Sequence, residues 1–309
     1  MTTAAVADVE TALPLTRKAA TVLESKGIEN ARLEAELLLA AVLGVKRLDL
    51  YLQHDRPVTA AELDAFRGAV RRRLRREPVQ YILGTVAFRT LELSVDPRVL
   101  IPRPETEVLA GAVVAWLASH PSARSALDLG TGSGAIALSL ARETSLERIV
   151  ATDVSAAALE VAASNAERNG ASARLELRQG ALWSAVAEDE VFDVIVSNPP
   201  YVGEAERTSL APEVRDWEPA EALFAGERGL DVIEPLVAGA PARLVLGGLL
   251  ALEVGAGQAT EVAALAEAAG LVNVRVLADL TGRERIVVAE AGAEAANRDG
   301  AIERSGSGS

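Results

Sequence analysis

The sequence predicts an α/β protein in which a doubly wound parallel sheet carries helices on both faces and follows a small helical domain. Three observations lead to this fold class. The first 76 residues are rich in Ala, Leu, Glu and Arg, with apolar residues at helical spacing. From about residue 126, short hydrophobic runs alternate with helical segments. A glycine-rich loop follows the first of these runs, at the position where such sheets bind ligands.

Composition narrows the functions that the chain can have. It has 309 residues, half of them hydrophobic, which suffices for one large core and a second, smaller one. The formal net charge of -13 disfavours a tight, salt-dependent binder of duplex nucleic acid. The absence of cysteine excludes disulfides, thiolate zinc sites and cysteine nucleophiles. No metal site is expected, because the only histidines, His54 and His120, lie far apart.

The N-terminal residues and the longest apolar run are the candidates for a secretory signal and a membrane span. Residues 1–15 lack a charged stretch followed by an apolar core, so no secretory signal is expected. The longest apolar run, 244–254, is shorter than the ~20 residues that span a membrane, and we expect a buried strand there. These features predict a soluble cytoplasmic protein with no membrane partner. The tail, 291–309, is rich in Ala, Gly, Ser and charge, and is expected to be disordered.

The N-terminal helices have recognisable ends. Asn30 is placed to cap a helix that Gly44 terminates, and Thr59 with Glu62 forms the pattern of a capping box. The last of these helices ends in an arginine-rich run, 71–76. This run has two interpretations, a solvated helix face or a docking patch for an acidic partner such as RNA.

A linker, 77–104, separates the helices from the sheet. Apolar residues alternate with polar ones from Val86 to Val95, around Arg89–Thr90, as in a short β-hairpin. Prolines then interrupt regular structure, and a helix is expected over 105–117. The strands expected after it are 126–129, 149–153, 174–178, 193–197, 248–253, 274–277 and 285–289. Helices between most of them predict the doubly wound sheet.

The glycine-rich loop, 128–135, lies between the first of these strands and a helix. Glycine lets the chain turn tightly there and lets a ligand approach the backbone. Asp153 ends the next strand, where a carboxylate accepts hydrogen bonds from ribose hydroxyls. Two cofactors fit this arrangement. The first two glycines with Ala135 satisfy a loose dinucleotide fingerprint, whereas all three glycines after an aspartate fit the loop that binds the nucleoside of S-adenosylmethionine.

A second motif, Asn198–Pro199–Pro200–Tyr201, directly follows the hydrophobic strand 193–197. In an open parallel sheet, ligands bind at the carboxyl ends of the strands, so this tetrapeptide is expected beside the glycine-rich loop. Proline has a fixed φ and no N–H, and the proline pair therefore holds nearby oxygen atoms rigidly.

The residue types of this motif suit methylation of a planar nitrogen. An amide or exocyclic amine has a delocalised lone pair and attacks an electrophile poorly. The side-chain oxygen of Asn198 and the backbone oxygen of Pro199 are placed to accept its two N–H groups, which stabilises the positive charge that develops on nitrogen. Tyr201 is placed to lie against the planar group. The motif favours a methyltransferase over a nicotinamide enzyme; adenine N6 and a glutamine amide both fit, and the acidic charge leans toward protein.

The chain resembles the HemK/PrmC family of peptide chain release factor glutamine N5-methyltransferases, from about residue 31 to residue 290. The stretches that carry the resemblance are Glu77–Gly84 with Phe88, Leu100–Glu107, Asp128–Ala135, Ser197–Tyr201 and Glu218–Asp231. The proline-rich stretch discriminates most, because general adenine methyltransferases do not share it.

The resemblance implies an S-adenosylmethionine-dependent methyltransferase domain over 105–290, a substrate-recognition domain over 1–76 and the hairpin linker over 77–104. It implies S-adenosyl-L-methionine as cofactor and S-adenosyl-L-homocysteine as product. The implied partners are class 1 peptide chain release factors, methylated on the glutamine of a Gly-Gly-Gln motif in translation termination. DNA is not expected as a partner.

The resemblance also assigns roles to residues by position. The residues expected to hold the cofactor are Gly130, Thr131, Gly132, Ser133, Gly134, Asp153 and Asn198. The residues expected to form the substrate pocket are Asn198, Pro199, Pro200, Tyr201, Phe88 and Arg103, of which Asn198, Pro199 and Tyr201 are the expected catalytic residues. Two of them have an alternative interpretation: Phe88 also fits a core residue of the hairpin, and Arg103 a surface charge.

One stretch departs from the family pattern. The family often has an acidic residue followed by an aromatic one after the third strand, but this chain has Ala181 where the acid is expected. Either Leu182 or Trp183 is then expected to cover the adenine. Two other functions are weighed: a nucleic-acid adenine N6-methyltransferase, which the arginine run 71–76 supports best, and a non-catalytic ribosome-associated module, which the intact Asn198 argues against.

Overall fold

The computed structural model describes residues 10–293, and these form two compact units. The first unit contains the residues up to Gly84 together with Pro212–Trp217, so the chain returns to it once. The second contains the remainder from Thr85 onward. The domain limits drawn from the sequence stay a prediction, and the predicted disordered tail lies almost wholly outside the described residues.

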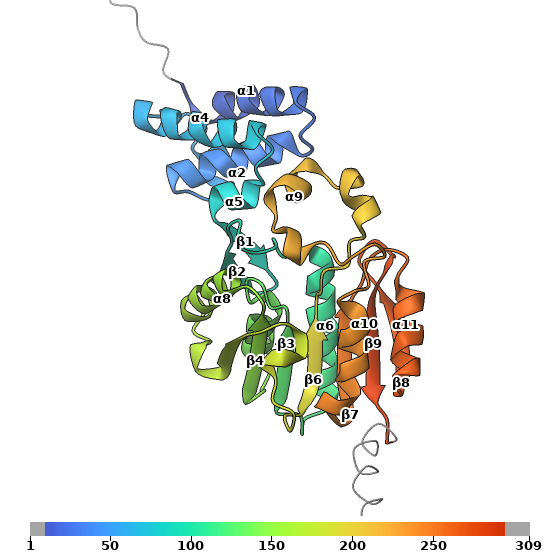
Figure 1. Ribbon diagram of the computed structural model, residues 1–309. Helices are drawn as coiled ribbons and strands as arrows, with labels where there is room; N and C mark the ends of the chain where they lie inside the picture. The colour runs from blue at the N-terminus through green and yellow to red at the C-terminus, as the bar shows by residue number, and fades with distance from the viewer. Residues whose placement is uncertain (1–9, 294–309) are drawn as a thin grey trace, which may run out of the picture. The chain divides into compact units, whose positions relative to one another are not determined.

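The first unit is helical (Figure 1). Its helices are α1 (Ala12–Ser25), α2 (Ala31–Leu43), α3 (Asp49–Leu52), α4 (Ala60–Leu74), α5 (Val79–Leu83) and α9 (Pro212–Trp217). Their apolar faces form one core, in which Leu23, Leu39 and Phe66 are buried. Because the apolar residues of each helix recur every three to four positions, each helix buries one stripe and exposes the other.

The three predicted helix ends lie where the sequence places them. Gly44 ends α2 with a φ of 64°, and at the start of α4 the Thr59 hydroxyl accepts from the Glu62 N–H while the Glu62 carboxylate accepts from the Thr59 N–H at 2.8 Å. Asn30 is the N-cap residue of α2, but its side chain makes no capping bond. It has a left-handed backbone with a φ of 53°, which Asn tolerates better than most residues.

The arginine run 71–76 takes part in ion pairs within the first unit. Arg73 is 4% exposed and pairs with Glu34 and Glu213. Arg76 shares Glu213 at 3.0 Å. Two of the positive charges therefore hold α9 and α2 against the end of α4. Neither interpretation made from the sequence anticipated this internal role.

The second unit begins with the predicted hairpin. Strands β1 (Thr85–Phe88) and β2 (Leu91–Ser94) pair antiparallel, and Arg89 takes a φ of 51° in the tight turn. The apolar face of the hairpin packs against α6 (Pro104–Ser119), which begins with proline in its first turn. Proline, which has no N–H, is favourable there because an N–H at that position would have no partner in the helix.

A seven-stranded sheet forms the body of the second unit, with the strand order β5-β4-β3-β6-β7-β9-β8. The strands are β3 (Ser125–Leu129), β4 (Arg148–Asp153), β5 (Leu175–Gln179), β6 (Phe192–Ser197), β7 (Leu244–Glu253), β8 (Leu271–Ala278) and β9 (Glu284–Ala291). The pairs from β5 to β7 are parallel, whereas β9 runs antiparallel to both β7 and β8. The predicted strands are all present, but an entirely parallel sheet is wrong: the turn 279–283 is far too short for the crossover that parallel strands need.

Helices cover both faces of this sheet. They are α6, α7 (Ala135–Glu143), α8 (Ala156–Arg168), α10 (Ile233–Gly239) and α11 (Ala259–Ala268), with short 3-10 turns η1 (Ser172–Arg174), η2 (Leu182–Ala185), η3 (Glu204–Ser209), η4 (Ala220–Ala222) and η5 (Ala240–Arg243). Alternate residues of the inner strands enter two different cores, whereas the edge strand β5 packs against one of them. One core contains α6, α7 and the hairpin, and the other contains α10 and α11, which lie beside the strands at the C-terminal edge of the sheet in Figure 1.

The register of the sheet determines where the site forms. Leu129 is paired with Thr152 on one side and with Ser197 on the other, so β3, β4 and β6 end at the same level. The glycine-rich loop, Asp153 and Asn198 follow directly from these three ends. Among residues 10–293, no helix has both the length and the apolar character that crossing a membrane requires.

Candidate functional site

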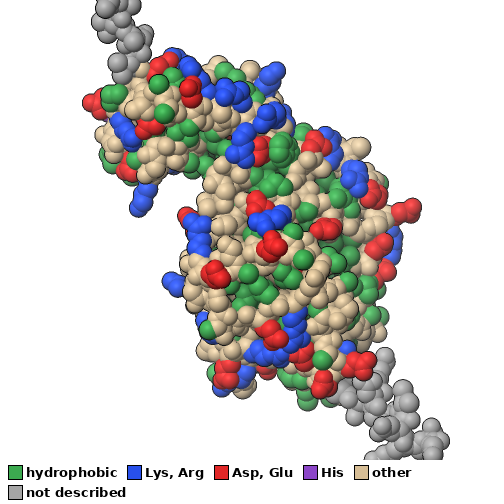
Figure 2. Space-filling model, turned by 60° about the vertical axis from the view of Figure 1, so that its left-hand side comes forward, with side chains coloured by type: hydrophobic (Ala, Val, Ile, Leu, Met, Phe, Trp, Pro, Cys, Tyr) green, Lys and Arg blue, Asp and Glu red, His purple; other side chains and the backbone are tan. Residues whose placement is uncertain are grey.

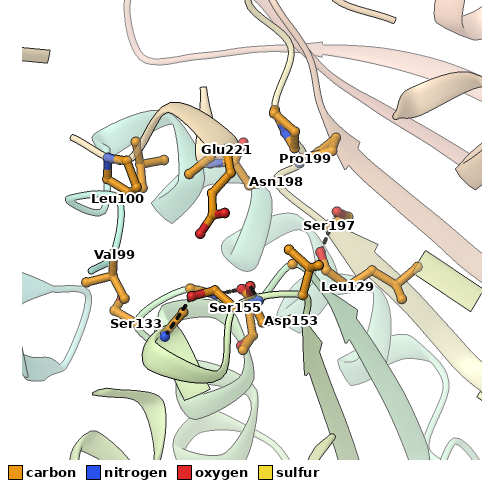
Figure 3. A pocket seen from close by; sticks show the side chains of 18 of the residues that line it. Val99, Leu100, Leu129, Ser133, Asp153, Ser155, Ser197, Asn198, Pro199 and Glu221 are labelled. Carbon is orange, nitrogen blue, oxygen red and sulfur yellow. Dashed lines mark hydrogen bonds between the residues drawn. The ribbon is translucent and has the colours of Figure 1, made fainter. Parts of the chain in front are cut away.

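A cavity of about 310 Å³ lies at the carboxyl ends of β3, β4 and β6. Its volume is at the lower end of the ~300–1,000 Å³ typical of small-molecule sites. The walls come from the glycine-rich loop, the turn after Asp153, the Asn198–Pro200 segment and the proline-rich linker. Figure 3 shows Asp153 and Ser155 on one side of this cavity and Asn198 and Pro199 on another, with Glu221 pointing into it.

The three glycines of the loop perform two different tasks. Gly130 and Gly132 have φ angles of 73° and 54°, and a Cβ on either would meet no atom within 4 Å. Both line the cavity, so their bare backbone leaves room for a ligand. Gly134, with a φ of 84°, lies outside the lining, and its Cβ would approach Leu138 and Ala162 at 3.2 and 3.4 Å. It therefore serves helix packing, and the prediction that it holds the cofactor finds no support in its position.

Two carboxylates hold the loop in place. Asp153 accepts from the Gly132 N–H at 2.8 Å and from the Ser155 N–H at 2.9 Å. Asp128 accepts from the Thr131 hydroxyl at 2.7 Å and from the backbone of α7. Burial raises the pKa of both carboxyls, that of Asp128 to about 7. Only Asp153 lines the cavity, where its oxygens keep lone pairs for further donors.

Asn198 presents a single unpaired polar atom to the site. Its Nδ2 donates to the Thr106 hydroxyl oxygen at 3.0 Å, whereas its Oδ1 is buried and has no hydrogen-bond partner among the described residues. Asn198 lines the cavity together with Ser197, whose hydroxyl donates to the Leu129 carbonyl at 2.6 Å and ties β6 to β3. A buried amide oxygen without a donor is costly, and it is therefore suited to receive one from a ligand.

Tyr201 lies next to this wall but not in the cavity lining. Its hydroxyl donates to Glu253 at 3.2 Å, and burial raises the pKa of the phenol. Its backbone oxygen accepts from the Gln258 side chain at 3.0 Å, and Gln258 in turn accepts from the Gly255 N–H at 2.7 Å. Gln258 thus positions the Asn198–Tyr201 turn. No local pattern in the sequence identifies it, because the contact spans distant segments of the chain.

The linker forms a further wall through Val99, Leu100 and Pro102. Arg103 does not line the cavity; it forms an ion pair with the buried Glu218, which also accepts from the Ile101 N–H at 3.4 Å. This pair fastens the linker to the segment after α9. A direct contact of Arg103 with a substrate, like that of Tyr201, stays a prediction.

Two residues expected in the site lie elsewhere. Phe88 is 1% exposed and packs in the core between the hairpin and α6, so the prediction that it contacts substrate is wrong. Trp183 donates its Nε1 to the Pro235 carbonyl at 3.0 Å and packs against Gly239, where even a Cβ would collide with the indole. Of the two side chains proposed to cover the adenine, only Leu182 lines the cavity, with a φ of 47°.

Several lining residues received no role from the sequence. Leu100, Pro102 and Thr106 belong to the proline-rich stretch, which was noted only for its resemblance to a family. Glu221 follows the linker-binding Glu218 and points into the cavity in Figure 3. Their order along the chain gives no hint of this, because the direction of a side chain in a loop depends on the tertiary fold.

The lining fits a cationic ligand that carries a nucleoside. Open glycine backbone at Gly130 and Gly132 accommodates a flat group at close range, and Asp153 has acceptor capacity for ribose hydroxyls. The charged lining residues are Asp153, Glu221 and Arg98, and Arg98 is paired with Asp96 and Glu160. The two carboxylates therefore leave the cavity with a net negative charge that favours a cation. S-adenosylmethionine meets these three requirements.

Comparisons with known proteins agree with this geometry. A model described as "PrmC N-terminal domain" matches residues 15–84, and one described as "Methyltransferase small domain" matches residues 108–214. The release factor glutamine methyltransferase of Geobacter sulfurreducens is 45% identical over 265 residues, which cover 86% of this chain and 91% of the relative. That of Cereibacter sphaeroides is 46% identical over 275 residues, covering 88% and 96%.

Solved structures show the same fold at lower identity. The catalytic domain of hMettl16, in complex with MAT2A 3'UTR hairpin 6, superposes with a TM-score of 0.55 and 16% identity. The match covers 69% of this chain and 81% of that one. At this identity the likeness concerns the fold alone.

Proposed function

Because the chain belongs to the release factor glutamine methyltransferase family, we propose that it methylates the side-chain amide nitrogen, N5, of the glutamine in the Gly-Gly-Gln motif of class 1 peptide chain release factors. The observation that carries the chemistry is the buried, unpaired Oδ1 of Asn198 at the cavity wall. The methyl donor is S-adenosylmethionine, whose sulfonium supplies an electrophilic methyl group when it is bound.

The residues around the glycine-rich loop would hold the donor. The backbone at Gly130 and Gly132 leaves room for it, and Asp153 accepts hydrogen bonds from the ribose. Leu182 provides an apolar surface for the adenine, in place of the acid-aromatic pair that the family often has there. Since Asp153 also accepts from the Gly132 N–H, one carboxylate fixes both the loop and the ribose.

Asn198 acts on the attacking nitrogen. An amide nitrogen attacks poorly because its lone pair is delocalised into the carbonyl group. When Asn198 Oδ1 and the Pro199 carbonyl accept its two hydrogens, the developing positive charge on nitrogen is stabilised by oxygens already in place. After the carbon–nitrogen bond forms, the nitrogen loses one proton to regain the neutral amide. Because an N-protonated amide is a strong acid, water suffices to take that proton.

The charge of the chain supports a protein substrate. The net charge is -13, and Figure 2 shows acidic and basic side chains interspersed on the face in view. Within the first unit, Arg72, Arg73 and Arg76 of the run that supported a nucleic-acid substrate are paired with glutamates, whereas Arg71 and Arg75 are exposed. Two exposed arginines are few for an extended phosphate backbone, so we do not propose DNA as a partner. A release factor would be met in the cytoplasm, where we place the protein.

The test is methyl transfer from labelled S-adenosylmethionine to a release factor purified without its own methylation. The control factor carries Ala in place of the glutamine, and parallel reactions contain DNA or RNA. We expect label only in the factor with an intact Gly-Gly-Gln motif. Label in nucleic acid and none in the factor would establish the adenine methyltransferase instead, and an absence of cofactor binding in calorimetry would favour a non-catalytic module.

A further inference from the structure

The side-chain amide of Asn198 has two possible orientations, which exchange its oxygen and its nitrogen. In the orientation that the structure has, the buried Oδ1 has no hydrogen-bond partner among the described residues, and Asn198 lines the cavity. Only this orientation leaves Oδ1 free to accept from a substrate N–H group. The other would present two N–H donors, which cannot accept those hydrogens. The reaction therefore requires the protein to select one orientation, and the selection has to come from the groups on the far side of the amide.

Thr106 is the group on that side. Its Oγ1 lies 3.0 Å from Asn198 Nδ2 and 2.7 Å from the Oε2 of Glu253. The three residues come from different elements: Thr106 from the first turn of α6, Asn198 from the end of β6 and Glu253 from the end of β7. They form a continuous chain of hydrogen bonds that ends at the cavity wall.

The polarity of this chain follows from the proton count when Glu253 is ionised, the form that prevails above its raised pKa of about 7. A threonine hydroxyl has one proton and two lone pairs, whereas an ionised carboxylate only accepts. The Thr106 proton is therefore committed to Glu253, and the lone pairs of Oγ1 face Asn198. An amide N–H is attracted to them, and the flipped Oδ1 would be repelled by them.

Burial makes this preference effective. Thr106 is 3% exposed and Glu253 is 1% exposed, so little water competes for their hydrogen bonds. The other oxygen of Glu253 accepts from the Tyr201 hydroxyl at 3.2 Å. One carboxylate thus orders two side chains of the Asn-Pro-Pro-Tyr motif. Removing a partner from a buried network costs more than the average hydrogen bond, because the remaining groups lose their partners.

We propose that Thr106 and Glu253 are positioning residues that fix the Asn198 amide with Oδ1 toward the cavity, so that it accepts a hydrogen from the substrate nitrogen. This inference rests on the proposed function for the identity of the substrate. It assigns to Thr106, which lines the cavity, and to Glu253 at the end of β7 a role in turnover that runs through the orientation of Asn198.

A matched pair of variants tests Thr106. Thr106→Val keeps the shape of the side chain and removes the hydroxyl, whereas Thr106→Ser keeps the hydroxyl. We expect Thr106→Val to lower kcat about tenfold or more, with the dissociation constant of S-adenosylmethionine changed by less than about twofold. Thr106→Ser is expected to retain most of the activity. Equal activity of wild type and Thr106→Val, or an equal loss in both variants, would overturn the proposal.

A double-mutant cycle tests the connection to Glu253. In Glu253→Gln the new amide donates as well as accepts, so the direction of the chain is no longer determined. We expect its kcat to fall, and we expect Thr106→Val with Glu253→Gln to be no slower than the worse single variant, because both changes break the same chain. Losses that multiply would mean that the two residues act independently and would contradict the inference.

A readout independent of activity separates this inference from the proposed function. In protein labelled with 15N-asparagine, the side-chain N–H signals of Asn198 are expected to exchange slowly in the wild type and at least about tenfold faster in Thr106→Val. Unchanged exchange would show that Thr106 does not fix the Asn198 amide, and it would refute this inference even if glutamine is the substrate. If the wild type methylates adenine and not glutamine, the proposed function fails. The same variants, assayed with adenine as the methyl acceptor, then test whether Thr106 and Glu253 position Asn198.

Discussion

Asn198 is the residue on which the chemistry depends most directly. Its Oδ1 is placed to stabilise charge in the transition state, while the loop and Asp153 are placed to bind the donor. We expect Asn198→Ala to lower kcat by about 10²–10³-fold, the usual cost of one such group, and to change the dissociation constant of S-adenosylmethionine by less than about threefold. Single-turnover kinetics and calorimetry measure the two quantities. Similar losses in both would mean that Asn198 mainly holds the donor.

Asp153 gives the complementary prediction, because it contacts the loop rather than the acceptor. Asp153→Ala removes the carboxylate that we propose accepts from the ribose, and it releases the Gly132 N–H. We expect affinity for S-adenosylmethionine to fall about tenfold or more, the effect of losing a charged hydrogen bond. Asp189→Ala removes an equal charge at an exposed position outside the cavity lining and is expected to have no effect. Unchanged affinity in Asp153→Ala would place the ribose contact elsewhere.

Two buried carboxyls make stability depend on pH. Burial raises the pKa of Asp128 and of Glu253 to about 7, whereas in an unfolded chain both titrate near pH 4. Their contribution to the free energy of unfolding is therefore fully present below about pH 4 and is lost as the pH rises through about 7. Arg178 and Arg148 lower the pKa of Glu190 to about 2. The stabilisation from Glu190 is therefore lost only in more acidic solution, below the pH range over which the stabilisation from Asp128 and Glu253 changes.

We therefore expect the free energy of unfolding to decrease between about pH 5 and pH 8, and to decrease less in Glu253→Gln, which has no proton to lose. Urea titrations of both proteins across this range measure the difference. Equal pH dependence of wild type and variant would show that Glu253 titrates normally in the folded protein.

For individual residues, sequence patterns predicted the backbone positions better than the side-chain contacts. Gly130, Gly132 and Asn198 follow strand ends, and strand ends meet at one edge of the sheet, so their proximity could be inferred. The pairing of Thr106 with Glu253 joins positions 147 residues apart, and no spacing rule reveals it. Phe88 was misplaced because a resemblance specifies a position in the chain without the direction of its side chain.

The positions of the strands were predicted from the sequence, whereas the direction of β9 was not. Most of the seven strands contain a short apolar run, and β5 alternates apolar with polar residues; sequence shows both patterns directly. The start of β7 was placed at residue 248 instead of Leu244 because Gly247 interrupts the run. The structure continues the strand through this point with an irregular register against β6. The antiparallel direction of β9 was missed because the periodicity of a strand does not encode its orientation.

Ion pairs of Arg73 attach the short helix α9 to the other helices of the first unit. Arg73 contacts Glu34 on α2 and Glu213 on α9, and its side chain is buried. We expect Arg73→Met to destabilise this unit by about 3 kcal/mol, because it breaks a buried ion-pair network. The exposed Arg71, changed to Met, is the matched control and is expected to alter stability by less than about 0.5 kcal/mol.

Limited proteolysis would report the same effect locally. With Arg73→Met, cleavage within Pro212–Trp217 is expected to become faster than in the Arg71→Met control, because α9 loses a partner. If both variants unfold at the same urea concentration and are cleaved at the same rate, the ion pairs contribute nothing to holding α9.

At the scale of the whole molecule, composition excluded more than it identified. The excess of 44 acidic over 31 basic residues disfavoured a nucleic-acid binder, and the absence of cysteine excluded thiol chemistry. Neither fact distinguishes a glutamine amide from any other planar nitrogen. That choice rests on similarity along most of the chain, which the relatives at 45% and 46% identity establish.

The central claim is that the amide nitrogen of one glutamine receives the methyl group. The measurement that tests it most directly is tandem mass spectrometry of the Gly-Gly-Gln peptide from a release factor incubated with the wild-type enzyme and S-adenosylmethionine. The account predicts a single added methyl on the glutamine, released as methylamine on acid hydrolysis, and its loss with Asn198→Ala. An unmodified glutamine, or a methyl on a carboxylate or the backbone, would contradict it.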